Sequence, residues 1–512
     1  MSNSNDNLFL LIKSLTQSEK RYFKLHNGKQ DGRNKYIDIF DAIDNCKAYN
    51  EEELKNGFKN KELVKNFAVI KNYLFNTIVE SLHEHSAYDT AEYKLEALIK
   101  KIKVLYEKAL IDLCLKYIEK AKKLANEHEC FTELIQLLSI QHQISLRNTS
   151  TLFNKQKEIR EELDLSVEKS INYSLYLKLI RNITYYTQVE NLNIESNEIS
   201  SLIKHPLLSE RNLTLSKKAL SLYLKIHATI SEYNGEKLDA IQYNYEILKS
   251  IELSPTIFNE NPFSYARAIN AYLQDAINVK HFEHFEHYLS ELKKLLSKKI
   301  SSHHLHTIKG FYYLNIINLQ IVYGRFNEVI EIIEKERDEI FKNLLIPTKF
   351  RIGIIYFECI AYIGTQQYKT TLKILHTNLS SNENTIFPLK RISRILSLIM
   401  QYELGNYTGL MSEIESASKF INSLENNMGE KLIIKHIKQL LNCFDKKDKI
   451  DCLEKFKNEL IKLESNSKEF LTISYFDFLS WVESKLRHKA FKEVINEKAL
   501  SYYPLKQMTN TA

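Results

Sequence analysis

Glycine and proline are scarce in this sequence, with 11 glycines and 6 prolines among 512 residues. Glycine loses backbone entropy inside a helix and proline removes a helical hydrogen bond, so their scarcity favours long, uninterrupted helices. Lys, Leu and Glu, which have high helix propensity, are among the commonest residues. No stretch shows a convincing strand-like alternation of apolar and polar residues. The composition therefore predicts an all-α fold.

Sequence motifs of catalysis are missing as well. The glycines form neither the G-x-G-x-x-G fingerprint of dinucleotide-binding proteins nor the G-x-x-x-x-G-K phosphate loop. The sequence contains no G-x-S-x-G turn of serine hydrolases and no H-E-x-x-H zinc motif. We therefore expect a protein that is not an enzyme and that carries no cofactor.

Paired cysteines, a signal peptide and long apolar runs are also absent. The six cysteines form no CxxC pair, which is typical of free thiols in a reducing compartment. Residues 1–6 lack the basic and apolar segments of a signal peptide. The uncharged run from Phe311 to Gly324 is too short to span a bilayer. We therefore expect a cytoplasmic protein without a membrane partner.

An excess of one charge is missing too. The 71 Lys and Arg residues against 64 Asp and Glu residues give a formal net charge of +7. Domains that bind nucleic acid are usually more basic and concentrate that charge on one face. Any role in nucleic-acid binding must therefore come from a local cluster.

A glycine repeat is the most informative feature that is present. Gly324, Gly364 and Gly405 recur in the second half with a period of about 40 residues, which is typical of stacked structural repeats. Pro347 and Pro388 precede the last two of these glycines by the same distance in the sequence. A segment that starts with proline and ends with glycine is typical of one helix, here of about 17 residues.

Residues 91–512 predict an array of about ten helical hairpins, including a C-terminal cap. A single hairpin cannot bury its apolar face, so neighbouring hairpins must stack. The last expected helix, Phe470 to Leu486, carries Phe476, Phe478 and Trp481, which either cap the core or form an oligomer interface; their apolar character favours a cap. Polar turns are expected near residues 111, 149, 190, 235, 280, 324, 364, 405, 446 and 488.

Residues 1–90 lack this period and predict a small helical N-terminal domain. A short apolar helix is expected from Asn7 to Leu15. Thr16 and Glu19 have the spacing of a capping box, which predicts that a second helix starts there. Further helices are expected near 35–46, 51–58 and 62–84.

The repeats resemble the tetratricopeptide family. Gly324-Arg-Phe326 and Gly405-Asn-Tyr407 match the glycine and the aromatic residue that this family places at the start of its second helix, and Gly235 with Ala240 matches another part of the pattern. The family's period is shorter than the one here. The resemblance implies a right-handed superhelix whose first helices line a concave groove, and it implies protein or peptide binding. The stretch 12–25 also resembles that of bacterial helical-repeat proteins, which implies no function.

Cations recur at one position of the expected first helices. The first three each precede a glycine of the repeat at one constant spacing. Cations near a helix N-terminus oppose the helix dipole, which costs about 0.3–1 kcal/mol each, so their repetition requires an explanation. The set consists of Lys309, Lys349, Lys390 and Lys431 and, one turn later on the last two helices, Arg394 and Lys435.

These cations predict a surface for binding another protein. One cation per first helix along the groove matches about every third residue of an extended acidic peptide, because packed helices lie about 8–10 Å apart. We therefore expect a scaffold or adaptor that binds an acidic extended segment. Ordinary solubility charge, with some pairing inside the chain, is the alternative explanation of the same residues, and the oligomeric state is left open.

Two further clusters could bind other ligands. Lys20, Arg21 and Lys24 in the N-terminal domain could contact phosphates, which would make the protein a transcriptional regulator with a peptide-sensing repeat domain. The segment from His281 to His287 places three histidines at spacings of three on one expected helix. One helix cannot surround a zinc ion by itself, so we expect a solvated or partly packed face and no metal site.

Overall fold

A computed structural model describes residues 6–27, 34–46, 49–58, 64–86, 90–147, 153–188, 196–258, 262–298, 300–343, 345–380, 383, 385–424, 427–443, 445–464 and 473–502. The regular elements in these ranges are helices, with no strand among them, which confirms the expected all-α class. Over the same ranges, no helix combines the length and the apolar character needed to cross a bilayer.

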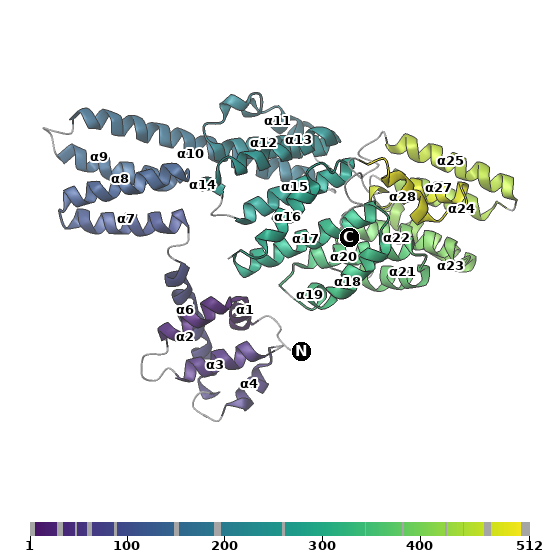
Figure 1. Cartoon of the computed structure of the whole chain (residues 1–512), viewed down its shortest axis with the longest axis horizontal. Coiled ribbons are helices and arrows are strands. Elements are labelled where there is room, and N and C mark those ends of the chain that lie inside the picture. Colours follow the sequence, from purple (N-terminus) through teal and green to yellow (C-terminus); the bar gives the residue numbers. More distant parts are fainter. Residues whose placement is uncertain are drawn as a thin grey trace.

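The first helices form a small bundle, drawn in purple in Figure 1. They are α1 (Asn7–Ser14), α2 (Gln17–Asn27), α3 (Asn34–Asn45), α4 (Glu51–Gly57) and α6 (Phe67–Ser86). The expected capping box is confirmed: Thr16 N–H donates to Glu19 Oε2 at 2.6 Å, and Glu19 N–H donates to Thr16 Oγ1 at 3.3 Å. Buried residues such as Ile12 and Phe40 form the core of the bundle.

From residue 91 on, successive helices lie side by side (Figure 1). The long α10 packs on α9 with its first half and on α12 with its second half. The elements of this part are α7 (Ala91–Glu107), α8 (Ile111–Glu127), α9 (Phe131–Arg147), α10 (Phe153–Gln188), α11 (Ser196–Ile203), α12 (Lys217–Asn234) and α13 (Lys237–Glu252).

The stack continues with helical hairpins. Two of their first helices, α20 and α22, have 17 residues each, as the proline and glycine spacing predicts. The elements are α14 (Pro255–Phe258), α15 (Pro262–Val279), α16 (Phe285–Leu295), α17 (Ser302–Val322), α18 (Phe326–Lys335), α19 (Arg337–Phe341), α20 (Thr348–Gly364), α21 (Tyr368–Ile374), the π-helical Leu375–Ser380, α22 (Phe387–Glu403), α23 (Tyr407–Asn422), α24 (Met428–Leu441) and α25 (Lys446–Glu464).

Successive hydrophobic cores of this stack share helices. Helix α10 contributes Ile159 to one core and Tyr176 to the next. Helix α17 likewise contributes Ile308 and Ile317 to two different cores. The stack is therefore continuously packed, whereas the core of the N-terminal bundle shares no helix with it over the described residues. The domain boundary near residue 90 and the right-handed superhelix stay predictions.

One backbone turn ends many of these helices. A residue one or two positions after the last helical residue takes a left-handed conformation. The next N–H then donates to the carbonyl five residues earlier, as from Arg325 to Gln320 at 2.9 Å and from Asn406 to Gln401 at 3.1 Å. This is the Schellman motif, which satisfies carbonyls at the helix end. The left-handed residues are Ala109, Glu129, Gly235, Lys280, Gly324, Gln366, Gly405 and His488.

These positions correct the expected repeat. The turn expected at Gly364 is centred on Gln366, with φ of 60°, and Gly364 is the last residue of α20. The turn at Glu129 was not expected. A regular array of hairpins would have two helices between the turns expected near 149 and 190. The structure instead has one helix of 36 residues there, α10. Residues 149 and 190 themselves lie outside the described ranges.

The last segment, 473–502, folds back onto the stack. It contains α27 (Phe478–Leu486) and α28 (Phe491–Ala499), drawn in yellow in Figure 1. Of the helix expected from Phe470 to Leu486, residues 470–472 lie outside the described ranges, residues 473–475 form a 3-10 turn, and the α-helix begins at Phe478. There Asp477 accepts a hydrogen bond from Ser480 N–H at 2.8 Å. The aromatic residues expected to form a cap, Phe476, Phe478 and Trp481, are buried. They belong to the same core as α20 and α22, so they pack inside the stack.

Candidate functional site

The expected binding surface lies on the first helices α17, α20, α22 and α24. Lys309, Lys349, Lys390 and Lys431 each belong to one of them, but not at equal distances from the helix start. Lys349 is the second residue of α20, whereas Lys309 lies in the second turn of α17. The positions of the cations in successive helices are therefore better compared by counting back from the turn that ends each helix than by counting from the helix start.

We call the repeated cations on these first helices the cation row. When the helices are aligned on the turn that ends each of them, one member of the cation row changes. Lys309 of α17 and Lys390 of α22 precede the left-handed glycine after their helix at the same spacing. The left-handed residue after α20 is Gln366, and the residue at that spacing before it is Arg351. Lys349 is thus two residues out of register. The sequence carried a signal for this, because Tyr368 follows Gln366 by two residues, as an aromatic residue follows each of the two glycines.

A close helix contact brings the first two cations to one level. Gly310 of α17 packs so closely against the Phe350 ring of α20 that an added Cβ would overlap the ring. Lys309 directly precedes Gly310, and Arg351 directly follows Phe350. The two cations are therefore carried at matching heights on neighbouring helices.

A buried ion pair between α22 and α24 brings the next two cations, Lys390 and Lys431, to matching heights. Arg391 Nε and Nη2 each lie 2.7 Å from Glu430 Oε1, and Glu430 is 0% exposed. Lys390 precedes this arginine and Lys431 follows this glutamate, so the pair sets the two lysines side by side on adjacent helices. Loss of one partner of a buried pair typically costs about 3–5 kcal/mol, so the register is firmly held. No motif in the sequence predicted this pair.

Two cations of the expected set already have an acidic partner in the chain. Lys309 Nζ donates to Glu339 Oε1 of α19. Lys435 Nζ lies 3.0 Å and 2.9 Å from the two carboxylate oxygens of Glu459 on α25. The hydrogen bond from Lys435 is the main cause that lowers the pKa of Glu459. Much of the charge of these two lysines is therefore neutralised within the chain.

Other cations of the row are less neutralised. Lys349 and Lys431 are exposed, while Lys390 and Arg351 are half-buried. The last two donate to neutral oxygens, at 3.5 Å to a backbone carbonyl and at 2.9 Å to a threonine hydroxyl. Over the described ranges, none of these four side chains forms an ion pair. Their positive charge remains available to a ligand.

Arg394 extends the row by one helical turn on α22. Its guanidinium carbon lies 4.3 Å from the centroid of the Phe420 ring, a cation–π arrangement. Its Nε has no hydrogen-bond partner among the residues that the structure describes. The aromatic ring orients the guanidinium without cancelling its charge.

Acidic side chains gather on α18, the second helix of one hairpin, and on the following α19. Four of them on α18 and α19 are exposed: Glu328, Glu331, Glu334 and Asp338. The charge on α18 and α19 is therefore opposite to that of the cations on α20, α22 and α24, and these acidic helices would repel an acidic ligand.

The C-terminal segment covers the other ends of the first helices. Tyr356 Oη, in the second half of α20, donates to the Tyr475 carbonyl at 2.5 Å. Trp481 Nε1 donates at 2.6 Å to Oε1 of Glu403, the last residue of α22. The cation row lies in the first halves of these helices and is left uncovered by these contacts.

The candidate nucleic-acid residues lie on α2 and face acidic residues of α3. Lys20 Nζ lies 2.5 Å from Asp44 Oδ1, and Lys24 Nζ lies 2.5 Å from Asp41 Oδ1. Arg21 is exposed. The two ion pairs neutralise most of the local positive charge that would contact phosphates.

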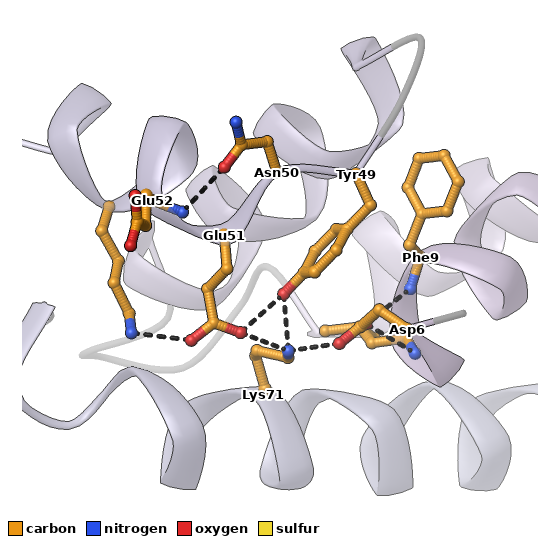
Figure 2. A network of polar contacts seen from close by, with 9 residues as sticks. Asp6, Phe9, Tyr49, Asn50, Glu51, Glu52 and Lys71 are labelled. Carbon is orange, nitrogen blue, oxygen red and sulfur yellow. Dashed lines mark hydrogen bonds and ion pairs between the residues drawn. The ribbon is translucent and has the colours of Figure 1, made fainter. Parts of the chain in front are cut away.

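A polar network joins three helices of the same bundle (Figure 2). Lys71 Nζ of α6 donates to Asp6, to Tyr49 Oη at 2.6 Å and to Glu51 Oε2 at 3.0 Å. Hydrogen bonds from Lys55 and Lys71 lower the pKa of Glu51 to about 2, and burial raises the pKa of Tyr49 to about 12. Asp6 also accepts from backbone N–H groups at the start of α1. We interpret the network as structural, because its lysine is fully engaged.

The histidine segment does not form one helix face, contrary to the expectation. His281 lies before the helix, and α16 starts only at Phe285. The His284 ring stacks on Tyr245, with centroids 4.9 Å apart, while His287 is exposed. In the part of the chain that the structure describes, no group of three or more His, Cys, Asp or Glu side chains could hold a metal ion.

No family model, curated protein or solved structure matches this chain. The resemblance to tetratricopeptide repeats therefore stays a prediction.

Proposed function

We propose that the array is a binding scaffold that holds an acidic, extended segment of another protein across the first halves of α20, α22 and α24. The main support is the level arrangement of Lys390 and Lys431, which the buried Arg391–Glu430 pair sets on adjacent helices. Packed helices are about 8–10 Å apart, so one cation per helix matches about every third residue of an extended chain.

The residues assigned to binding are those whose charge is not neutralised in the chain. They are Arg351, Lys390, Arg394 and Lys431. Lys349 is not assigned to the surface, because residues two apart in a helix point to different sides and it lies two residues from Arg351. Lys309 and Lys435 contribute less, because Glu339 and Glu459 already pair with them. The proposed function is binding rather than catalysis.

Apolar side chains beside the cations would supply part of the affinity. Ile386, just before α22, is 47% exposed, and Met428, the first residue of α24, is 58% exposed. Charges guide and orient a ligand, whereas buried apolar anchors usually dominate the binding energy. The preferred ligand is therefore an acidic segment with interspersed apolar residues.

The test is affinity purification of the tagged protein from its source cells, with mass spectrometry of the eluate. The variant Arg351→Glu/Lys390→Glu/Lys431→Glu should lose a partner that wild type captures. A matched control, Lys103→Glu/Lys116→Glu/Lys120→Glu, reverses three exposed lysines on α7 and α8 and should retain it. A partner that is retained by both variants would contradict the assignment of the surface.

DNA binding by the N-terminal bundle is not proposed. Lys20 and Lys24 already pair with Asp44 and Asp41, so only Arg21 of the three candidates keeps an exposed charge. Nonspecific DNA affinity requires several unneutralised cations in contact with phosphates.

A further inference from the structure

The cations at the two sides of the row are each held by a carboxylate of the chain. On one side, Lys309 Nζ of α17 donates to Glu339 Oε1 of α19. On the other side, Lys435 Nζ of α24 lies 3.0 Å and 2.9 Å from the two carboxylate oxygens of Glu459 on α25. The cations whose charge is not neutralised lie on α20, α22 and α24. An internal ion pair therefore closes the cation row at each side.

A second contact fixes Glu339 beside α17. Tyr313 Oη donates to Glu336 Oε2 at 3.0 Å. Tyr313 follows Lys309 by four residues, and Glu336 precedes Glu339 by three, so the two contacts lie one helical turn apart on the same face of α17. Asn343 Nδ2 also donates to Glu339 Oε1 at 3.3 Å. Two carboxylates thus lie against α17, where the cation row would otherwise continue.

Glu459 is fixed beside α24 in a similar way. The ring of His436, the residue after Lys435, stacks on Phe456 of α25 with centroids 4.5 Å apart. Phe456 precedes Glu459 by three residues, so the ring contact and the ion pair lie one helical turn apart on α25. His436 Nε2 also lies 3.1 Å from Glu459 Oε2. Hydrogen bonds from Lys435 and, to a smaller extent, from His436 lower the pKa of Glu459, so this carboxylate is ionised at neutral pH.

We propose that Glu339 and Glu459 limit the acidic stretch that the binding surface accepts to about six residues. The inference rests on the proposed function, because it describes the ligand of the same surface. The three neighbouring helices α20, α22 and α24 span about 16–20 Å, since packed helices lie about 8–10 Å apart. An extended chain covers this distance with about six residues. Acidic residues beyond this stretch would meet a carboxylate whose lysine is already paired, so they would add little affinity.

Neutralising the two carboxylates should release their lysines to a longer ligand. In Glu339→Gln/Glu459→Gln each side chain keeps its size and loses its charge. Lys309 and Lys435 would then offer a positive charge at both sides of the row. Each exposed ion pair that a longer ligand forms with a released lysine should tighten its binding by up to about fivefold.

The test compares two labelled peptides by fluorescence anisotropy at low salt. Both have the same length and the same interspersed leucines. The short-stretch peptide has an acidic stretch of about six residues flanked by serines, and in the long-stretch peptide glutamates replace these serines. Wild type should bind the two peptides within about twofold of each other, whereas Glu339→Gln/Glu459→Gln should prefer the long-stretch peptide by at least about fivefold.

Two further variants separate the release of the lysines from a general change in charge. Addition of Lys309→Met and Lys435→Met to the double variant should remove its preference. Glu328→Gln/Glu331→Gln neutralises two exposed carboxylates on α18 and should bind both peptides as wild type does. Circular dichroism checks that all variants fold.

The inference is overturned if wild type itself strongly prefers the long-stretch peptide, or if Glu339→Gln/Glu459→Gln gains no preference. It is also overturned if the preference persists without the two lysines, or if Glu328→Gln/Glu331→Gln gains the same preference. In each of these cases the proposed function stands, because wild type still binds an acidic peptide. If wild type binds neither peptide, the proposed function fails and this inference fails with it.

Discussion

At the scale of single residues, glycine has two different uses in this chain. Gly324 and Gly405 take left-handed φ values of 67° and 68°, which glycine adopts without strain. Gly364 lies within a helix and is needed for space, because an added Cβ would overlap the Phe326 ring. The sequence shows glycine at all three positions and cannot distinguish the two uses. This ambiguity explains why Lys349 was assigned to the cation row: its position was counted from Gly364, whereas the turn is centred on Gln366.

A non-glycine residue at the left-handed position carries strain, which gives a first prediction. Ala109 has φ of 56° between α7 and α8. The left-handed conformation costs an L-residue about 1–2 kcal/mol. Glycine removes this strain, but its larger conformational entropy in the unfolded chain offsets part of the gain. Ala109→Gly should therefore raise the free energy of unfolding by about 0.5–1 kcal/mol. Chemical denaturation followed by circular dichroism measures the change.

The control for this variant is Lys116→Gly, on the exposed face of α8. Glycine inside a helix should lower the free energy of unfolding by about 1 kcal/mol. A decrease in both variants would contradict the claim that Ala109 is strained.

The packing role of Gly364 gives a second prediction. Gly364→Ala should destabilise the protein by about 1–3 kcal/mol, because the methyl group must displace the Phe326 ring in a packed core. Gly57→Ala is the matched control, since an added Cβ there would meet no atom within 4 Å. Thermal melts of the two variants should differ clearly, and equal melting temperatures would argue against close packing at Gly364.

At the scale of helices, much of the fold was predictable from local signals. The capping box at Thr16, Pro347 just before α20 and Pro388 in the first turn of α22 mark helix starts, because they act within one turn of the chain. Helix α10 was not foreseen as one element. The repeat period predicts a turn within this segment. The segment contains no glycine or proline that would interrupt the helix there.

Polar contacts between helices were invisible to such local signals. Asp275 of α15 is 7% exposed and accepts a hydrogen bond from Asn244 Nδ2 of α13 at 2.6 Å. Burial raises its pKa from 3.8 to about 7, with Glu232 adding to the effect and the Asn244 bond and Lys225 opposing it. The sequence alone shows an ordinary aspartate in an amphipathic helix.

The raised pKa of Asp275 predicts a pH dependence of stability. Between about pH 4 and pH 7 the folded protein holds a proton that the unfolded chain has lost, so this contribution to stability falls as the pH rises. Asp275→Asn keeps an acceptor for Asn244 and removes the ionisation. It should stabilise the protein at pH 8, by up to about 4 kcal/mol, and change little near pH 4.

Melting temperatures at pH 4 and pH 8 provide the measurement. Asp239→Asn, an exposed position on α13, serves as the control and should have little effect at either pH. A stabilisation of Asp275→Asn that does not depend on pH would contradict the ionisation argument.

At the scale of the whole molecule, the return of the C-terminal segment is the least predictable feature. Trp481 and Glu403 are 78 residues apart in sequence, and their 2.6 Å hydrogen bond depends on the path of the whole stack. The burial of Phe476, Phe478 and Trp481 agrees with their apolar character, but no local pattern shows which helices receive them. The cation row was predictable in part, because its residues repeat, while the Arg391–Glu430 pair that aligns it was not.

The C-terminal segment should be essential for the stability of the hairpins that it contacts. Trp481→Ala should destabilise the protein by about 3–5 kcal/mol, because it leaves a cavity and removes the donor to Glu403. Tyr407→Ala, at an aromatic residue that is 60% exposed, is the control and should have a small effect. Denaturation midpoints test this, and similar midpoints for the two variants would mean that the segment is only loosely attached.

The central claim is that Arg351, Lys390 and Lys431 form one surface for an acidic segment. Fluorescence anisotropy with a labelled glutamate-rich peptide that contains interspersed leucines tests it most directly. The triple reversal to Glu should weaken binding at least about tenfold, equivalent to about 1.4 kcal/mol, and the affinity of wild type should fall with rising salt. The reversal of Lys103, Lys116 and Lys120 should leave the affinity within about twofold of wild type. Equal affinities of wild type and the first variant would contradict the account.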